Sequence, residues 1–303
     1  MFSPYYHWAS RSRLRREGRA AEADDHVALN LALYGDTRRW AMTERSAASL
    51  RRDRHTLSIA RSHVHWNGQA LTVEIDEWAS PWPRRLRGTL RIFPQALSRH
   101  VSALDAEGAH RWAPIAPCAR AELHLSEPAL RWSGVAYLDS NEGDEPVTVP
   151  FSHWHWQRAA LPDGGTAVVY DVVRKSREAC EAHQAHEAHE ADKTRAGKGT
   201  EAGASAATIA MHFDARGGER AIDSVPPAHD LPHTSWGIQR RARSETPVVV
   251  QQSLENTPFY ARSLLELGWK GRRVPAVHET LSIPRLASPW VRMLLPARMP
   301  RTG

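Results

Sequence analysis

Short extended segments separated by turn residues recur along most of this chain. His26–Tyr34 (HVALNLALY) has the alternation of a buried strand and ends at Gly35 and Asp36. Asn67 and Gly68 form a strong two-residue hairpin signal between two further segments. Because short strands with turns about every 8–12 residues are typical of barrels and sandwiches, we expect an all-β fold with few short helices. The expected strands are 26–34, 39–44, 56–59, 64–66, 71–75, 88–93, 151–158, 166–173, 208–213, 236–240, 248–252 and 278–281.

Three segments break this pattern. Residues 258–267 (PFYARSLLEL) carry apolar side chains at rough helical spacing, which predicts one short helix. Residues 11–25 are highly charged and are expected to form a loop. Residues 175–207 consist mainly of Ala, Glu, His, Gly and Lys and have little to bury. We therefore expect them to be a low-complexity insertion that can be removed without loss of fold or activity.

Size and composition allow one large or two modest domains. The chain has 303 residues, of which 41% are apolar, and this is enough for a sizeable core. It has neither an apolar run of about 18 residues nor a charged-then-apolar leader, so we expect no spanning helix and no signal peptide. Two cysteines, Cys118 and Cys180, are too few for a disulfide framework and are typical of reduced thiols in a cytoplasmic protein.

The formal net charge of +6 leaves three interpretations of the basic surface. A nucleic-acid partner is not expected, because the sequence has no basic helix, zinc spacing or aromatic RNA-binding motif. An anionic membrane surface suits the scattered arginines, whose stems can lie on apolar surface while their heads reach phosphates. A solvated surface without any charged partner is the third interpretation.

The region from His110 to Asp139 concentrates reactive groups on two neighbouring strands. His110 and Trp112 are two residues apart, and so are Tyr137 and Asp139. In an extended chain this spacing places both members of a pair on one face. A turn at 126–128 joins the segments, so one surface could carry an imidazole, an indole, a phenol and an acid. This set suits the formation and quenching of a carbocation, because aromatic faces stabilise positive charge without attacking it.

Each of these residues also has a structural interpretation. Asp139 begins a stretch rich in turn formers, and a histidine at a loop-to-strand junction such as His110 is more often structural. Trp112 and Tyr137 could simply be core residues. Against this, an acid that generates a carbocation by protonation must be neutral when substrate binds, and an apolar pocket raises a carboxyl pKa by desolvation. The twelve tryptophans fit either a large core or the walls of a site for an apolar ligand.

Weaker motifs limit the cofactors that can be expected. His183, His186 and His189 repeat every three residues, but they lie in the low-complexity insertion, and we expect no metal site there. His153 and His155 alternate with tryptophans, so one face of that strand is expected to line a cavity. The sequence has no GxGxxG after a strand, no P-loop and no nucleophile elbow, and neither a nucleotide cofactor nor serine hydrolase chemistry is expected.

Several characteristic runs follow one another over nearly the whole chain. They are FSPYY, HVALNLALYG, RWAMTER, GAHRWAPIAP, GVAYLDSNEGDEP, FSHWHWQRA, TPFYARS and VHETL. No single run is specific, but together they resemble the carotenoid 1,2-hydratases (hydroxyneurosporene synthases) of phototrophic bacteria. Relatives usually have a short apolar strand before FSPYY, so we expect either a late start or a missing edge strand here.

The resemblance implies both a fold and a reaction. The fold would be two lipocalin-like β-barrel halves in tandem, residues 1–150 with most of the site and residues 151–303 with the insertion. The reaction would be cofactor-free addition of water to the terminal C1=C2 bond of an acyclic carotenoid such as neurosporene or lycopene. At the matching HRW and YLD motifs, the resemblance implies that Asp139 protonates C2, His110 holds the water, and Trp112 and Tyr137 face the cation.

A cytoplasmic enzyme at the periphery of the inner or photosynthetic membrane would fit this substrate. A second class of function fits the same residues equally well. A lipocalin-like carrier could bind a hydrophobic polyene and return it unchanged, and only the products distinguish the two.

Overall fold

The computed structural model describes residues 4–175 and 206–302, which are mostly β-strand. Most of the expected insertion, with Cys180 and the histidine repeat, lies outside the described residues. The first large sheet is formed by β4 (Leu50–Arg52), β5 (Thr56–Ile59), β6 (Ser62–Trp66), β7 (Leu71–Trp78), β8 (Arg85–Pro94), β9 (Ser102–Ala103), β10 (His110–Glu127) and β11 (Leu130–Gly143). The second is formed by β12 (Phe151–Ala160), β13 (Thr166–Arg174), β14 (Ala206–Phe213), β15 (Glu219–Ala221), β18 (Val249–Asn256), β19 (Tyr260–Trp269) and β20 (Arg272–Ser282).

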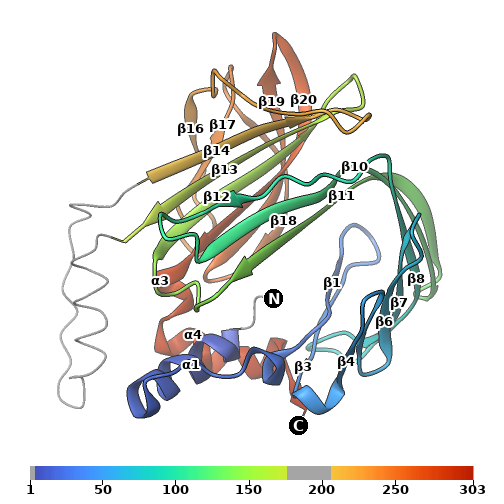
Figure 1. The fold of residues 1–303 in the computed structure, drawn as a ribbon, viewed down its shortest axis with the longest axis vertical. Coiled ribbons are helices and arrows are strands. Elements are labelled where there is room, and N and C mark those ends of the chain that lie inside the picture. The colour runs from blue at the N-terminus through green and yellow to red at the C-terminus, as the bar shows by residue number, and fades with distance from the viewer. Residues whose placement is uncertain (1–3, 176–205, 303) are drawn as a thin grey trace.

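Smaller elements complete the fold (Figure 1). They are α1 (Pro4–Glu17), two short 3₁₀ turns (Ala23–His26 and Ala47–Ser49), β1 (Asn30–Leu33), β2 (Arg39–Met42), β3 (Glu44–Arg45), β16 (Ala228–Leu231), β17 (Arg240–Arg243), α3 (Ile283–Leu286), α4 (Pro289–Arg298) and β21 (Arg301–Thr302). The expected all-β class with few helices is therefore confirmed. Among the described residues, no helix is both long and apolar enough to span a membrane.

Both large sheets are open in their hydrogen-bonded order. The strand order of the first sheet is β11-β10-β8-β7-β6-β5-β4, and that of the second is β15-β14-β13-β12-β20-β19-β18. Within residues 4–175 and 206–302, the two end strands of each sheet do not pair with each other. The closed barrels expected from the resemblance are thus not formed by these pairings. One core cluster shared by the sheets gives a physical reason, because Trp112 and Cys118 of the first pack with Phe151, Val168 and Tyr170 of the second. Apolar faces that are buried against each other do not each need to curl into a separate barrel.

The two ends of the chain meet beside the first sheet. The β1–β2 hairpin lies against that sheet, where Leu33 and Ala41 join Ile75, Leu86 and Leu123 in one cluster. At the other end of the chain, β21 pairs in parallel with β3. In Figure 1 the helices α1 and α4 lie together at one end of the molecule, and β1 rises between the two sheets. The C-terminal segment therefore holds the N-terminal elements in place.

The loop expected over residues 11–25 is partly wrong, because α1 extends from Pro4 to Glu17. Its sequence carries no clear apolar stripe, which is why periodicity did not reveal it. Tertiary contacts stabilise the helix instead: Tyr5 and Trp8 pack against Leu295 and Met299 at the end of α4. Packing of this kind contributes most of the stability of short helices.

The helix expected over residues 258–267 is wrong, because this segment lies largely in strand β19. Ala261, Ser263, Leu265 and Leu267 are buried at every second position, which is the period of a strand. Two of these buried positions are occupied by the small residue Ala261 and the polar residue Ser263. The large apolar residues alone therefore have a spacing that resembles a helix. Similarly, the strand expected at 236–240 is displaced, since β17 begins only at Arg240.

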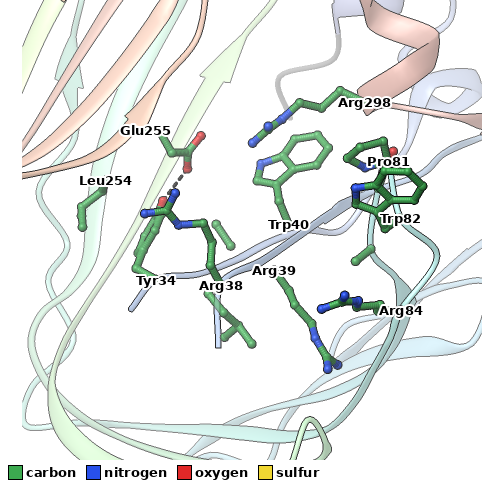
Figure 2. Close-up of a pocket in the computed structure, with 14 residues that line it drawn as sticks. Tyr34, Arg38, Arg39, Trp40, Pro81, Trp82, Arg84, Leu254, Glu255 and Arg298 are labelled. Carbon is green, nitrogen blue, oxygen red and sulfur yellow. Dashed lines mark hydrogen bonds between the residues drawn. The ribbon is translucent and has the colours of Figure 1, made fainter. Parts of the chain in front are cut away.

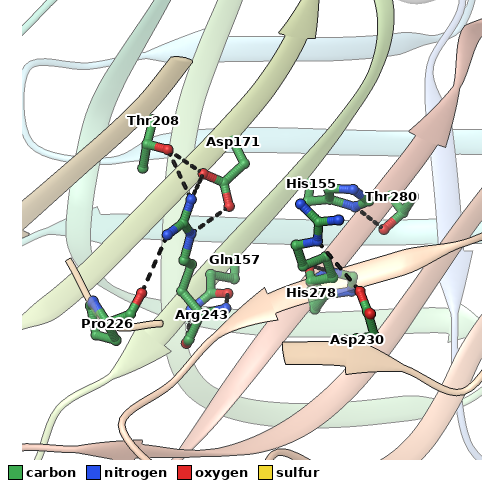
Figure 3. A network of polar contacts seen from close by, with 10 residues as sticks. His155, Gln157, Asp171, Thr208, Pro226, Asp230, Arg243, His278 and Thr280 are labelled. Atoms are coloured by element: carbon green, nitrogen blue, oxygen red, sulfur yellow. Dashed lines mark hydrogen bonds and ion pairs between the residues drawn. The ribbon is translucent and has the colours of Figure 1, made fainter. Parts of the chain in front are cut away.

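A buried polar network lies on the face of the second sheet that is covered by β16 and β17 (Figure 3). Arg243 pairs with Asp171 through two hydrogen bonds of 2.9 Å. Nearby, the rings of His155 and His278 stack at 6.3 Å, with His155 Nδ1 2.9 Å from Thr280 Oγ1 and His278 Nε2 2.9 Å from the Arg241 carbonyl oxygen. Burial lowers the pKa of His155 to about 2 and that of His278 to about 4.

These two histidines should make the fold sensitive to acid. Between pH 6.5 and the lowered pKa, the unfolded chain binds protons that the folded protein does not, so the free energy of unfolding falls as pH falls below 6.5. At pH 5 the loss should be about 2 kcal/mol for each histidine. His278→Gln retains an N–H donor for the Arg241 carbonyl, and its denaturant-unfolding free energy should fall by about 2 kcal/mol less than that of the wild type between pH 7.5 and pH 5. An equal fall in both proteins would contradict this assignment.

Candidate active site

Three of the four residues singled out in the sequence come together at one end of the β10–β11 hairpin. Trp112 on β10 lies opposite Asn141 on β11, which makes Asp139 its diagonal neighbour on the same face. The Trp112 Nε1–H donates a hydrogen bond of 2.8 Å to Asp139 Oδ2. The Tyr137 hydroxyl donates to the same oxygen at 3.1 Å. The alternation of β11 therefore aligns Tyr137 with Asp139 as expected.

The surroundings of Asp139 favour the protonated form of its carboxyl group more than water does. Burial raises the pKa of its carboxyl group. The hydrogen bonds from Trp112 and Tyr137 act in the opposite direction but do not cancel the rise, and the charge of Glu279 adds to it. With Oδ2 accepting two hydrogen bonds, a proton on Oδ1 would be the one available for transfer.

Aromatic rings from the second sheet surround this carboxyl group. The Tyr137 ring lies 5.4 Å from that of Trp156, and the Trp112 ring meets Tyr170 edge-on at 6.1 Å. Trp154 lies beside Tyr170 at 6.3 Å. Trp154 and Trp156 occupy the face of β12 opposite to His155, so the tryptophan face is the one directed at the site. The candidate site consequently lies between the two sheets.

His110 occupies a separate position next to this cluster. It is buried, with Nδ1 3.0 Å from Asp105 Oδ2, Nε2 3.1 Å from the Glu145 carbonyl oxygen, and its ring against Phe151 at 4.9 Å. Both polar partners are acceptors, so both contacts are hydrogen bonds only when both ring nitrogens carry a proton. Gly143 leaves room for the ring, since a Cβ there would lie 2.7 Å from His110 Cδ2.

Asp105 is a residue that sequence reasoning missed. Its carboxylate accepts backbone hydrogen bonds from Ala109 at 2.8 Å and His110 at 2.7 Å in addition to the ring contact. Burial alone would raise the pKa of Asp105, but these hydrogen bonds outweigh it and the pKa is lowered. An ionised Asp105 thus fixes the orientation of His110. Only its place five residues before the histidine could have drawn attention to it.

A second carboxylate faces the site from the other sheet and was also missed. Arg262, Glu279, Trp156 and Tyr170 are successive partners across β19, β20, β12 and β13, so they form one row on one face. Glu279 Oε1 accepts from Arg262 Nε at 2.9 Å and pairs with Arg262 Nη2 at 2.8 Å. Because Trp156 touches Tyr137 and Tyr170 touches Trp112, this row places Glu279 on the second sheet, next to the ring that packs on Tyr137. The VHETL run contained Glu279, but spacing gave it no role.

Comparison with known proteins decides the family. The profile of the carotenoid hydratase CrtC family matches residues 1–200 and 198–303. The chain belongs to the carotenoid hydratase family. It is 45% identical over 304 residues to an acyclic carotenoid 1,2-hydratase of Rubrivivax gelatinosus and 42% identical over 307 residues to one of Thiocapsa roseopersicina, covering 99% and 100% of this chain but 67% of each relative. An acyclic carotenoid 1,2-hydratase of Cereibacter sphaeroides is 31% identical over 99% of this chain and 95% of its own length.

A cavity of about 270 Å³ is lined by residues of the β1–β2 hairpin, of the loop that follows β7, of β18 and of the end of α4 (Figure 2). Trp40, Pro81, Trp82 and Arg298 line it on one side, and Tyr34 and Glu255 line it on the other. The Tyr34 hydroxyl donates a short hydrogen bond to Glu255 and accepts one of 2.8 Å from Arg262 Nη1. Arg262 therefore connects the cavity wall to Glu279.

Within residues 4–175 and 206–302, no group of three or more His, Cys, Asp or Glu side chains is arranged to hold a metal ion. Cys118 is buried, with its sulfur 3.7 Å from Thr166 Oγ1, and burial raises the pKa of its thiol. Cys118 is thus an unreactive core residue.

Proposed function

We propose that this chain adds water to the terminal C1=C2 double bond of an acyclic carotenoid such as neurosporene or lycopene. The observation that carries the proposal is the Asp139 carboxyl group, which is set among aromatic rings with a raised pKa in a chain of the carotenoid hydratase family. A neutral acid in an apolar, aromatic site is what protonation of an unactivated alkene requires. The reaction changes no oxidation state overall, so it needs no redox cofactor.

The first step forms a carbocation. Asp139 transfers its proton to C2, the π electrons of the double bond form the new C–H bond, and C1 becomes a tertiary cation. Tyr137 and Trp156 offer ring faces beside Asp139 that stabilise this charge without reacting with it. Trp112 is fully buried and acts through its hydrogen bond to the carboxylate that remains.

The second step adds water. A water oxygen bonds to C1, and the resulting oxonium loses a proton to the Glu279 carboxylate, which is paired with Arg262. Return of that proton from Glu279 to Asp139 restores both groups, so the net change is the addition of one water. For His110 we assign a positioning role instead of direct contact with water, because both of its nitrogens already have protein partners.

The domain and membrane assignments extend the same proposal. The strands of the first large sheet all precede residue 150 and those of the second all follow it, which supports two lipocalin-like halves at 1–150 and 151–303. Because an acyclic carotenoid dissolves in lipid, the protein would act from the cytoplasm at the surface of the inner or photosynthetic membrane. The positive net charge supports such a surface.

Product analysis tests the proposed function against a carrier. Purified protein incubated with lycopene in water labelled with heavy oxygen should release more polar carotenoids that carry the label. A carrier would bind lycopene and return it unchanged. Bound but unaltered lycopene, recovered from folded protein after long incubation, would reject hydration as the function.

Trp112→Phe should reduce the hydration rate about tenfold, because loss of one hydrogen bond to the carboxylate costs about 1–2 kcal/mol. Phenylalanine retains an aromatic face but lacks the N–H that donates to Asp139 Oδ2. Trp132→Phe is a matched control, because Trp132 lies exposed on β11 and should tolerate the change at full rate. The measurement is the initial rate of each variant on lycopene. Equal rates for the two variants would exclude a role of Trp112 in the mechanism.

A further inference from the structure

Helix α4 exposes an apolar stripe in addition to the one it buries. Val291, Leu295 and Met299 pack inwards. Trp290, Met293, Leu294 and Ala297 follow the i, i+3, i+4, i+7 spacing of one helix face and point outwards. Met293 is 77% exposed and Leu294 is 47% exposed. Adjacent exposed apolar side chains on one helix face mark an interaction surface.

Further aromatic groups extend this stripe on both sides. The ring of Trp236 stacks on Trp290 at 5.8 Å. At the other end of α4, the Ser80 hydroxyl donates a hydrogen bond of 2.8 Å to the Ala297 carbonyl oxygen. This contact fixes the loop that carries Trp82, whose side chain is 76% exposed. Tryptophan side chains are favoured at the boundary between lipid and water.

Arginines flank the stripe and surround the cavity next to it. Arg292 lies over the Trp8 ring at 5.3 Å and Arg298 over the Trp40 ring at 4.5 Å, so both guanidinium groups are held beside α4. The cavity that Arg298 and Trp82 share is lined by four arginines and one acidic side chain, namely Arg38, Arg39, Arg84, Arg298 and Glu255. This charge is complementary to an anionic surface.

We propose that the outer face of α4 and the Trp82 loop dock on an anionic lipid surface, and that the adjoining cavity receives the end of the polyene directly from the lipid. The inference rests on the proposed function, since it assumes a substrate dissolved in the bilayer. The apolar stripe enters the boundary region while the arginines reach lipid phosphates. The cavity then opens at the membrane, and its inner wall at Tyr34 and Glu255 connects through Arg262 to the carboxylates that act on the double bond.

Sedimentation with vesicles tests the docking face. The wild type should bind vesicles of phosphatidylglycerol and phosphatidylcholine, and binding should weaken several-fold on pure phosphatidylcholine because the arginines lose their partners. The double variant Met293→Ser/Leu294→Ser should bind the mixed vesicles at least about tenfold more weakly. Its matched control is Leu97→Ser/Val101→Ser, which alters two exposed apolar residues near β15 and should bind like the wild type.

Activity measured in two media completes the test. The stripe variant should lose hydration of lycopene in vesicles in proportion to its lost binding but keep the wild-type rate in detergent micelles. Failure of the wild type to bind anionic vesicles, or equal binding by the stripe variant and its control, would overturn the proposal. The proposal would also be overturned if the stripe variant lost its hydration activity in micelles. If the wild type does not hydrate lycopene in micelles, the proposed function fails, while sedimentation still decides whether this face docks.

Discussion

Asp139→Asn should slow hydration by about 10²–10⁴-fold while leaving the melting temperature almost unchanged. The amide has the size of the acid, and its oxygen can accept the hydrogen bonds from Trp112 and Tyr137. It has no proton to give to an alkene carbon. Because burial disfavours the charged form of this carboxyl group, replacing it with a neutral amide removes little electrostatic stabilisation. Initial rates on lycopene and a thermal melt of each protein measure the two effects.

Asp144→Asn provides the control for this substitution. Asp144 lies just beyond the same strand, is exposed, and forms hydrogen bonds of 2.9 Å with Arg111, so its loss should leave the rate unchanged. A folded Asp139→Asn protein with nearly the wild-type rate would exclude Asp139 as the acid. Glu145 would then be the next acid to test, because burial raises the pKa of its carboxyl group. Glu142 and Asp144 are exposed beside Arg111 and fit the role less well.

Glu279→Gln should reduce the hydration rate on the order of 10²-fold, the lower end of what a general base contributes. The amide cannot take the proton from the attacking water. Glu266→Gln is the control, since Glu266 is a partly exposed carboxylate on β19 near Arg273 and should tolerate the change. Initial rates on lycopene, measured beside a thermal melt of each protein, distinguish loss of a base from loss of a merely structural partner of Arg262.

Ionisation of Asp139 removes the transferable proton, so the hydration rate of the wild type should fall on the alkaline side. The raised pKa of Asp139 places that alkaline fall above the ordinary range of an aspartate. Glu279→Gln should keep this fall, because its acid is unchanged. A folded Glu279→Gln protein with nearly the wild-type rate would show that another group accepts the proton.

The strands and the central pairing were predictable because they depend on local periodicity. The alternation in 151–158 and 166–173 anticipated β12 and β13, and the turn at 126–128 anticipated the β10–β11 hairpin. Within that hairpin, the two-residue spacing of Tyr137 and Asp139 is enough to place both on one face. Apolar spacing failed at β19, where Ala261 and Ser263 occupy buried positions, and at α1, which depends on contacts with residues nearly 300 positions away.

The sequence alone determined the all-β class, the family and the grouping of Trp112, Tyr137 and Asp139, because each follows from local patterns or from recognisable runs. Only the tertiary structure decided which other side chains face that group. Glu279 and Arg262 reach the site because β19 and β20 lie in register with β12, and Trp156 of β12 packs on Tyr137. His110, two residues from Trp112, instead turns to Asp105 and Glu145. The pairing of β12 with β20 joins residues more than a hundred positions apart, and no local periodicity encodes such pairing or the packing of one sheet on the other.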